Sequence, residues 1–421
     1  MQNLLEKIDA LEQRFNQTEP RILAFVPEAG RFNRLRTDAL RLLDQYHAEG
    51  TRPPLFGVLL GVKDMFHVAG FDTRAGSRLP SEVLRGPEAV PVSTLKAAGA
   101  LIVGKTNTTE FAYFSPGPTR NPHNAAHTPG GSSSGSAAGV AAGLCELALG
   151  TQTIGSVSRP AAYCGVVGFK PTYDRISIEG VIPLAGSLDH VGLFAREVRG
   201  VLQGAAILVK GWRPPVNLGK PVLGIPAGPY LERAEPEGLA HFQQVVDHLK
   251  GKGLAIQEIK VMADFDEIFE RHYLLTAAEA ARVHRAWFAE YAPLYAAKTA
   301  ELIRRGAGIP EDELARARAA QLAFRKKLGA QMAENAVDLW LSPAAPGAAP
   351  RGLETTGSPV MNLPWTQAGL PTLTLLAGGN AAGLPLGLQL TGGWWQDELL
   401  LAWGLEIENL LAELNPPEER R

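Results

Sequence analysis

The first 50 residues carry apolar side chains at the spacing of amphipathic helices. Intervals of three and four residues recur in two series, Leu4, Leu5, Ile8, Leu11 and Phe15, then Leu35, Leu42, Leu43 and Tyr46. Residues at these intervals share one face of a helix, so the pattern predicts helices that pack on a core. Pro20 and Gly50 interrupt it. The sequence therefore predicts N-terminal helices within residues 1–50.

From residue 55 the pattern changes to short apolar runs. They occupy residues 55–62, 100–106, 166–169, 221–226, 371–377 and 386–392, and the segment 338–350 begins with another such run before a proline-rich loop. Short runs rich in β-branched side chains are typical of strands buried on both faces, and helical patterns between them favour parallel pairing. The sequence therefore predicts an α/β protein, a three-layer α/β/α sandwich around a large mixed, mostly parallel β-sheet.

Residues 265–335 differ from this alternation. Alanine, arginine and leucine recur there at helical spacing, which predicts a helical elaboration of the sandwich. The Gly/Pro-rich stretches elsewhere are short, and no internal repeat is present. We therefore expect one domain over residues 1–421, with the elaboration near its substrate pocket.

Composition and charge exclude several classes of protein. Of the 421 residues, 45% are hydrophobic and 20% charged, and the net charge is −2 with no long run of one sign, so we expect neither a nucleic-acid partner nor a membrane partner. Charges at Glu6, Lys7 and Asp9 interrupt any apolar stretch that could form a secretory signal. The two cysteines lack CxxC spacing, which argues against a disulfide scaffold or a cysteine zinc site. We expect a cytoplasmic protein.

The stretch PGGSSSGSAAGVAAG at residues 129–143 fits three functions: a flexible linker, a phosphate loop or a catalytic loop. A linker would continue without periodicity, whereas this run passes directly into strong helix formers. A phosphate loop would end in Gly-Lys followed by Ser or Thr, and no lysine follows here. Evidence for or against a catalytic loop must come from other parts of the sequence.

A second glycine-flanked segment, GTQTIGSVSRPAAYCGVVGFKPT at residues 150–172, contains Ser156. The backbone N–H groups of residues 153–156 (Thr153, Ile154, Gly155 and Ser156) could converge on one point, as an oxyanion hole requires. A serine nucleophile also needs a base. Lys63 follows an apolar run, where burial would lower its pKa and make a neutral, basic lysine accessible. By itself, however, Lys63 beside Asp64 is more typical of a structural salt bridge.

Several motifs together resemble the amidase signature hydrolases. They are GVKD at 61–64, GKTNTTEFA at 104–112, TRNPHNAAHTPGGSSSGSAAGVAAG at 119–143, the segment 150–172, SLDHVG at 187–192 and NLPWTQAGLPTLTL at 362–375. The resemblance covers residues 20 to 410. The separations between Lys63, Ser132 and Ser156 also resemble those of the Ser-cisSer-Lys triad of that family.

The resemblance implies a role for each of these residues. Ser156 would attack a carboxamide carbon, and Lys63 would act as general base. Ser132, preceded by a cis peptide bond from Gly131, would relay protons between them, and water would then hydrolyse the acyl-enzyme. Ser133 and Ser134 would support the loop. No metal or cofactor is implied.

Four positions depart from the common family pattern. Gln152 stands in place of an aspartate, Ile154 in place of a glycine, and Ser158 in place of an arginine, whereas Arg159 comes one residue later. We expect Gln152 and Arg159 to support the loop through a different set of hydrogen bonds. In an extended chain, the one-residue shift would turn Arg159 to the opposite side.

Three other groups of residues fit structural roles better than chemistry. The segment SLDH at 187–190 holds the residue types of a Ser-His-Asp triad, but four consecutive residues cannot form the required row. His123 and His127 lack a third metal ligand nearby. Cys145 and Cys164 are expected to be buried, inert thiols.

We therefore predict an enzyme that hydrolyses a small-molecule carboxamide to an acid and an amine or ammonia. Two alternatives stay open: the glutaminase subunit of a tRNA-dependent amidotransferase, and a catalytically inactive binding protein on the same fold. Residues 113–127, 265–335 and 343–367 would supply the substrate pocket, with Tyr113, Phe114 and Trp365 as candidate lining residues. The helical segments could also support a homodimer.

Overall fold

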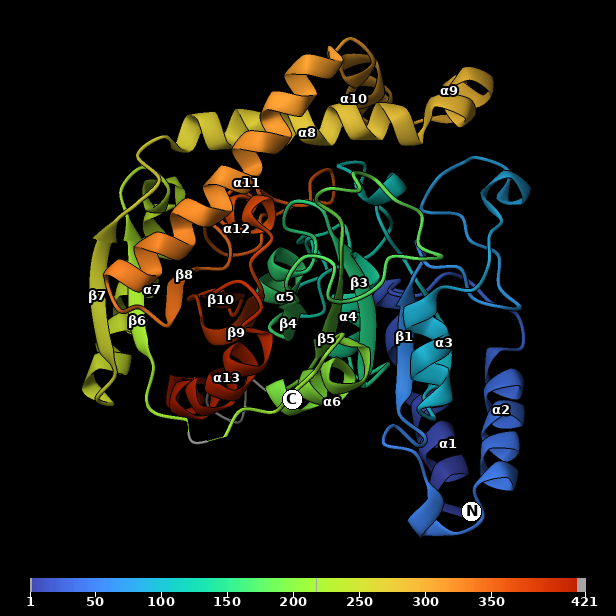
Figure 1. Cartoon of the computed structure of the whole chain (residues 1–421). Coiled ribbons are helices and arrows are strands. Elements are labelled where there is room, and N and C mark those ends of the chain that lie inside the picture. Colours follow the sequence, from blue (N-terminus) through green and yellow to red (C-terminus); the bar gives the residue numbers. More distant parts are fainter. Residues whose placement is uncertain (1, 217, 415–421) are drawn as a thin grey trace.

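The computed structural model describes residues 2–216 and 218–414 and contains one ten-stranded mixed sheet (Figure 1). The strands are β1 (Leu59–Lys63), β2 (Leu101–Thr106), β3 (Leu147–Gln152), β4 (Val167–Lys170), β5 (His190–Ala195), β6 (Val222–Ala227), β7 (Ala255–Lys260), β8 (Leu339–Pro343), β9 (Thr372–Gly379) and β10 (Pro385–Gly392). Their order across the sheet is β2-β1-β3-β5-β4-β9-β10-β8-β6-β7.

Helices cover both faces of this sheet, which confirms the predicted α/β/α sandwich. They are α1 (Gln2–Ile22), α2 (Arg31–Gln45), α3 (Val90–Ala97), α4 (Ser134–Ala141), α5 (Ser158–Cys164), α6 (Val198–Leu208), α7 (Pro236–Gly251), α8 (Phe265–Val283), α9 (Arg285–Tyr291), α10 (Ala297–Ala307), α11 (Glu311–Glu334), α12 (Leu363–Ala368) and α13 (Asp397–Leu411). Apolar side chains of α3, α6, α7 and α13 pack in one core cluster, and those of α1, α2, α4 and α5 in another.

The sheet is mixed, as predicted, but it is not mostly parallel. Among the described strands, four neighbouring pairs are parallel and five are antiparallel. The antiparallel pairs lie in the middle of the sheet, between β3 and β8. Because helices cover both faces there too, the central strands are as apolar as parallel ones, and the apolar runs did not reveal their direction.

Every predicted strand is present, and three further strands were not predicted: β3, β5 and β7. The strand β7 lies at the edge of the sheet with most of its side chains exposed, so it has no apolar run. The strand β3 is buried but ends in Thr151 and Gln152, whose polar side chains point to a role other than packing.

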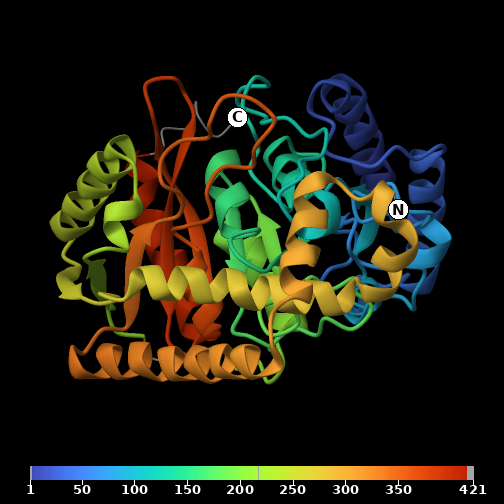
Figure 2. The same cartoon turned by 90° about the horizontal axis from the view of Figure 1, so that it is seen from above.

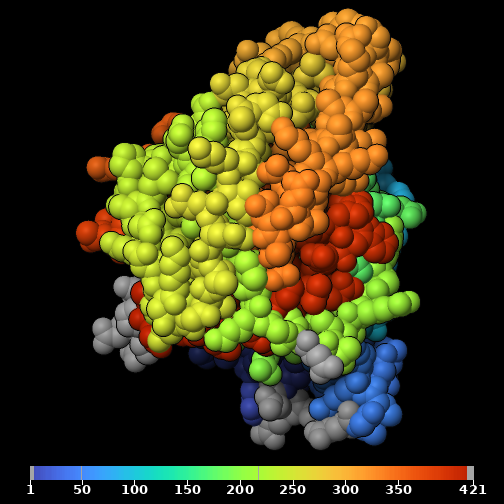
Figure 3. Space-filling view, turned by 60° about the vertical axis from the view of Figure 1, so that its left-hand side comes forward, coloured from blue at the N-terminus to red at the C-terminus, as the bar shows by residue number. Residues whose placement is uncertain are grey.

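The predicted helical elaboration consists of α8 to α11. These helices gather on one side of the molecule and lie across the ends of several strands (Figures 1 and 2). In the space-filling view, the orange surface of the later helices of this group lies next to a yellow surface to which α8 contributes (Figure 3). Within the described ranges, no helix is long and apolar enough to cross a membrane.

Candidate active site

Lys63 is the last residue of β1, and its side chain is completely buried. Its Nζ lies 2.7 Å from Ser132 Oγ and 2.7 Å from Thr151 Oγ1. Burial lowers the pKa of Lys63 well below its usual value, and this effect outweighs the opposing field of Asp189. The structure therefore joins Lys63 directly to the serine loop.

The neighbouring carboxylate does not neutralise this lysine. Asp64 pairs instead with Lys105 on β2, at 2.8 Å, and both side chains are buried. The salt bridge that sequence reasoning allowed for Lys63 thus belongs to Lys105. Lys63 keeps only hydroxyl and carbonyl oxygens as hydrogen-bond partners in the described part of the chain.

The serine loop lies between Lys63 and the second glycine-flanked segment. The Gly131–Ser132 peptide bond is cis. Ser133 Oγ donates to Thr151 O at 3.2 Å, and Ser134 Oγ donates to Gly130 O at 2.8 Å. Both side chains therefore hold the loop in place through hydrogen bonds, as expected for supporting residues.

Ser156 follows β3 in a turn beside this loop, with 6% of its surface exposed. The N–H of Ser133 donates to Ser156 O at 3.4 Å, which holds the two segments side by side. Among the described residues, no hydrogen bond joins Ser132 Oγ to Ser156 Oγ.

The backbone between β3 and α5 has four N–H groups that no acceptor in the described part of the chain satisfies. In the described ranges, no protein acceptor is bonded to the N–H groups of residues 153–156. A Cβ at Gly155 would collide with the Asn362 side chain and would lie 2.9 Å from Pro359 Cβ, so only glycine fits there. These donors are available to an atom that is not part of the chain.

Three side chains from distant elements fix this segment. Thr153 Oγ1 donates to Asp189 Oδ1 at 2.6 Å, and His272 Nε2 lies 3.0 Å from Thr153 O. Thr366 Oγ1 donates to Ile154 O at 2.6 Å. Sequence reasoning missed all three anchors. Two motifs carried a signal: SLDHVG contains Asp189, in a segment interpreted as a structural loop, and NLPWTQAGLPTLTL contains Thr366.

Two of these anchors are ionisable but have shifted pKa values. Burial raises the pKa of Asp189 to about 6, although its hydrogen bonds from Thr153, Leu184 and Ala185 favour the charged form. Burial lowers the pKa of His272 to about 3, so its ring is neutral at neutral pH and can donate from Nε2. The anchors are hydrogen-bonding groups rather than a charge pair.

Gln152 makes the different set of hydrogen bonds that was expected for it. Its Oε1 accepts from the N–H groups of Val157 and Ser158 at 2.8 and 2.9 Å, and its Nε2 donates to Thr366 Oγ1 at 2.9 Å. The expectation for Arg159 is partly wrong, because Ser158 and Arg159 begin helix α5 rather than an extended strand. Arg159 Nη2 reaches Gly131 O at 2.5 Å.

The aromatic candidates for the pocket separate into two groups. Trp365 is completely buried, and its Nε1 donates to Tyr230 Oη at 2.9 Å, so it packs in the core rather than lining a pocket. Tyr113 and Phe114 are half-buried and contact each other, with ring centroids 4.7 Å apart. Only this second pair fits the surface of a substrate site.

The histidine and cysteine side chains that were assigned structural roles contact backbone atoms or lie in the core. His123 Nε2 lies 2.9 Å from Cys164 O, and His127 Nδ1 lies 2.8 Å from Ala349 O. Cys145 and Cys164 are buried, and burial raises the pKa of both thiols. Among residues 2–216 and 218–414, no cluster of side chains could hold a metal ion.

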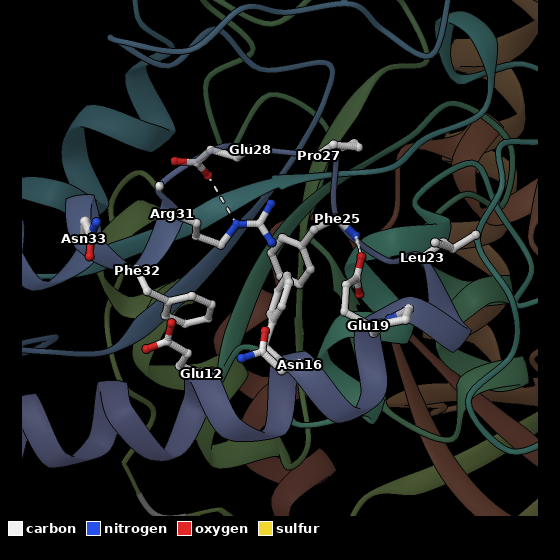
Figure 4. A pocket seen from close by; sticks show the side chains of 13 residues that line it. Glu12, Asn16, Glu19, Leu23, Phe25, Pro27, Glu28, Arg31, Phe32 and Asn33 are labelled. Carbon is white, nitrogen blue, oxygen red and sulfur yellow. Dashed lines mark hydrogen bonds and ion pairs between the residues drawn. The ribbon is translucent and has the colours of Figure 1, made fainter.

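A cavity of about 520 Å³ lies elsewhere, between α1 and α2 (Figure 4). The Arg31 guanidinium projects into it, 4.4 Å from the centroid of the Phe15 ring, and Glu28 accepts a hydrogen bond from Arg31 Nε. Neither Lys63, Ser132, Ser156 nor any of their hydrogen-bond partners described above lines this cavity. The candidate site is therefore the cluster around Lys63, Ser132 and the turn at Ser156.

Comparison with known proteins gives matches over most of the chain. A family model described as amidase matches residues 6–401. The A subunit of the glutamyl-tRNA(Gln) amidotransferase from Synechococcus sp. (strain WH7803) is 34% identical, with 94% of this chain and 91% of the relative covered. The corresponding protein of Thermus thermophilus is 35% identical, with 88% of each covered. A crystal structure of an amidase is 32% identical, with a TM-score of 0.88 and coverage of 98% and 96%.

Proposed function

Because this chain belongs to the amidase family, we propose that it hydrolyses the C–N bond of a small, non-peptide carboxamide through a serine acyl-enzyme. The products are a carboxylic acid and an amine or ammonia. The observation that carries the proposal is the distance of 2.7 Å between the buried Lys63 Nζ and Ser132 Oγ, beside Ser156. A buried lysine whose pKa is lowered and whose Nζ is already bonded to a hydroxyl is well placed to accept a proton.

Each side chain then has one task. Ser156 Oγ attacks the carbonyl carbon while its proton passes to Ser132, whose own proton passes to the lone pair of Lys63. Thr151 supports this direction, since its hydroxyl and carbonyl oxygens can accept the two N–H bonds of a neutral amine. The proton returns through Ser132 to the departing nitrogen, and water later cleaves the acyl-enzyme by the same route.

The negative charge that develops on the substrate oxygen needs donors that are already in place. The unbonded N–H groups of residues 153–156 are proposed as this oxyanion hole. Their anchors, Asp189, His272 and Thr366, support the assignment because a fixed backbone needs no reorganisation when charge appears.

The test compares wild type with Ser156→Ala on a panel of short aliphatic and aromatic amides and ureas, together with a covalent fluorophosphonate probe for reactive serines. We expect turnover and labelling in the wild type and neither in the variant. Absence of both from correctly folded wild type would favour an inactive binding protein. Full activity or labelling in Ser156→Ala would refute the assignment of the nucleophile.

A second candidate function uses the same chemistry for a different purpose. The similarity to the A subunit of an amidotransferase extends over 94% of this chain, and taken alone the relatives favour this candidate. In it, the chain releases ammonia from glutamine for partner subunits that act on tRNA. Turnover of simple amides by the purified chain alone supports the first candidate, whereas glutamine hydrolysis only with added partner subunits supports the second.

A further inference from the structure

Arg159 is a buried cation without a counter-ion in the described part of the chain. Only 2% of its surface is exposed. Its Nη2 donates to Gly131 O at 2.5 Å and to Thr356 Oγ1 at 3.0 Å, but Nε and Nη1 have no hydrogen-bond partner among the described residues. Nε carries one N–H and Nη1 carries two, so three strong donors have no acceptor in the part of the chain that the structure describes.

The charge persists at neutral pH. Burial lowers the pKa of Arg159 to about 10, and the neighbouring ionisable groups that oppose this shift are the phenols of Tyr163 and Tyr273. A buried charge without a partner is strongly destabilising. Arg175 shows the ordinary solution in the same chain: it is equally buried, and it pairs with Asp397 at 3.0 Å and Glu398 at 2.8 Å.

The guanidinium lies where the two catalytic loops meet. It bonds to Gly131, the residue before Ser132, while the backbone N–H of Arg159 donates to Gly155 O, the residue before Ser156, at 3.0 Å. Thr356 belongs to the loop between β8 and α12, and Tyr273 belongs to α8. An anion bonded to the free donors of Arg159 would therefore lie beside the loop of Ser132 and the turn of Ser156.

We propose that Arg159 binds a carboxylate of the substrate, so that the preferred substrates are amides that carry a carboxylate close to the amide group. The inference rests on the proposed hydrolase function. A carboxylate would satisfy the three free N–H bonds and neutralise the buried charge in one step. The rival explanation is purely structural, in which Arg159 only holds Gly131 in place.

The kinetic test uses pairs of amides matched in length: the monoamide of succinic acid with butyramide, and the monoamide of glutaric acid with valeramide. Wild type is expected to prefer the carboxylate-bearing member by about 100-fold in kcat/KM. In Arg159→Met this ratio falls to about one, and Arg159→Lys, which keeps the charge, retains part of it. A structural role would lower both members equally and leave the ratio unchanged, which would overturn the proposal.

A binding test separates failure of the proposal from failure of the hydrolase function. Succinate and glutarate are titrated calorimetrically into Ser156→Ala and into Ser156→Ala/Arg159→Met, with butyramide as the neutral control. If Ser156→Ala binds the dicarboxylates and Ser156→Ala/Arg159→Met does not, the result supports the anion site even if no amide is hydrolysed. Equal binding by both variants, or a wild type that hydrolyses neutral amides as fast as charged ones, overturns it.

Discussion

The pKa of Lys63 decides in which pH range the proposed base works. Burial keeps this pKa well below the ordinary value, so the amine is neutral at a pH where a surface lysine is still charged. Activity requires the neutral form and is lost as pH falls through the pKa of the folded protein. The lower limb of the pH profile thus reports on this side chain.

We predict that Lys63→Ala lowers kcat/KM by about 10²–10⁴-fold. Its residual activity should rise toward high pH, where hydroxide replaces the base, and the lower limb of the wild-type profile should vanish. The pH dependence of kcat/KM measures both effects, with the exposed Lys96→Ala as control. Normal rates at neutral pH in Lys63→Ala would exclude Lys63 as the base.

Lys170 offers a second buried amine, whose effect should appear in stability rather than in activity. Its Nζ donates to Leu370 O at 2.5 Å and Pro171 O at 3.1 Å, and burial lowers its pKa to about 7. Between that pKa and the ordinary value of 10.5, the unfolded chain binds one proton more than the folded chain. Stability from this group therefore rises with pH above about 7.

We predict that the free energy of unfolding of the wild type, relative to Lys170→Met, increases by up to about 1.4 kcal/mol per pH unit above pH ~7. Urea unfolding at intervals between about pH 7 and 9 measures this difference. If the free energies of unfolding of the two proteins change in parallel with pH, the folded lysine keeps an ordinary pKa. That result would contradict the effect of burial.

How much of the site could be predicted depends on the kind of contact. Lys63, Ser132 and Ser156 were predicted because specific short motifs carry them. His272 was not, since it contacts Thr153 across 119 residues of sequence and no local pattern marks it. Arg159 was expected to support the loop, but its unsatisfied donors depend on burial that only the tertiary structure defines.

At the level of elements, the turn after β3 is held by helices from later parts of the chain. Thr366 on α12 donates to Ile154 O and accepts from Gln152, so one hydroxyl links α12 to both ends of the turn. Loss of this hydroxyl should loosen the proposed oxyanion donors without touching the serines or Lys63.

We predict that Thr366→Val, which keeps the shape of the side chain, lowers kcat about tenfold with little change in the pH profile. Steady-state kinetics measures the effect. Thr374→Val is the matched control, because the buried hydroxyl of Thr374 on β9 has no hydrogen-bond partner among the described residues. Equal loss of activity in both variants would show that repacking, not the hydrogen bond, is responsible.

Helices α8 and α10 meet through a glycine. A Cβ at Gly306 would collide with Ala277 O and would lie 2.9 Å from Ala281 Cβ on α8. The two backbones can approach this closely only because residue 306 has no side chain. Gly329 on α11 provides the opposite case, since a Cβ there would meet only open space.

We predict that Gly306→Ala lowers the free energy of unfolding by about 1–3 kcal/mol through overpacking. Gly329→Ala should instead raise it by about 0.5–1 kcal/mol, since alanine favours a helix. Chemical denaturation of both variants measures the contrast. A stabilising Gly306→Ala would mean that α10 is free to move away from α8.

Across the whole molecule, the C-terminal helix is joined to the middle of the sheet by charge. Arg175 follows β4, and its partners Asp397 and Glu398 begin α13, more than 200 residues later. Asp397 also accepts from the N–H and hydroxyl of Thr172, so the group is hydrogen-bonded on several sides. Removal of the cation would leave buried carboxylates without compensation.

We predict that Arg175→Met destabilises the protein by about 3–5 kcal/mol. The matched control, Lys252→Met, breaks the exposed pair between Lys252 and Glu413 and should cost less than about 1 kcal/mol. Thermal and denaturant unfolding compare the two. Similar losses in both would show that the Arg175 cluster is no stronger than a surface ion pair.

The class of fold was predictable from apolar runs alternating with helices, whereas the order of the strands was not. The hairpin of β9 and β10 occupies the centre of the sheet, although it comes late in the sequence. The apolar runs identified both strands. Their pairing with β4 and β8, however, depends on contacts between residues far apart in the sequence, which no local pattern shows.

The central position of this hairpin has a consequence for synthesis on the ribosome. Before residues 372–392 emerge, strands β2-β1-β3-β5-β4 and strands β8-β6-β7 have no strand to join them, and β4 and β8 each lack a neighbour. Unpaired apolar edges of this kind invite pairing between chains. The nascent protein therefore carries a high risk of aggregation until residues 372–392 emerge. Until then Lys63, Ser132 and Ser156 have been synthesised, but the sheet that positions them is still in two parts.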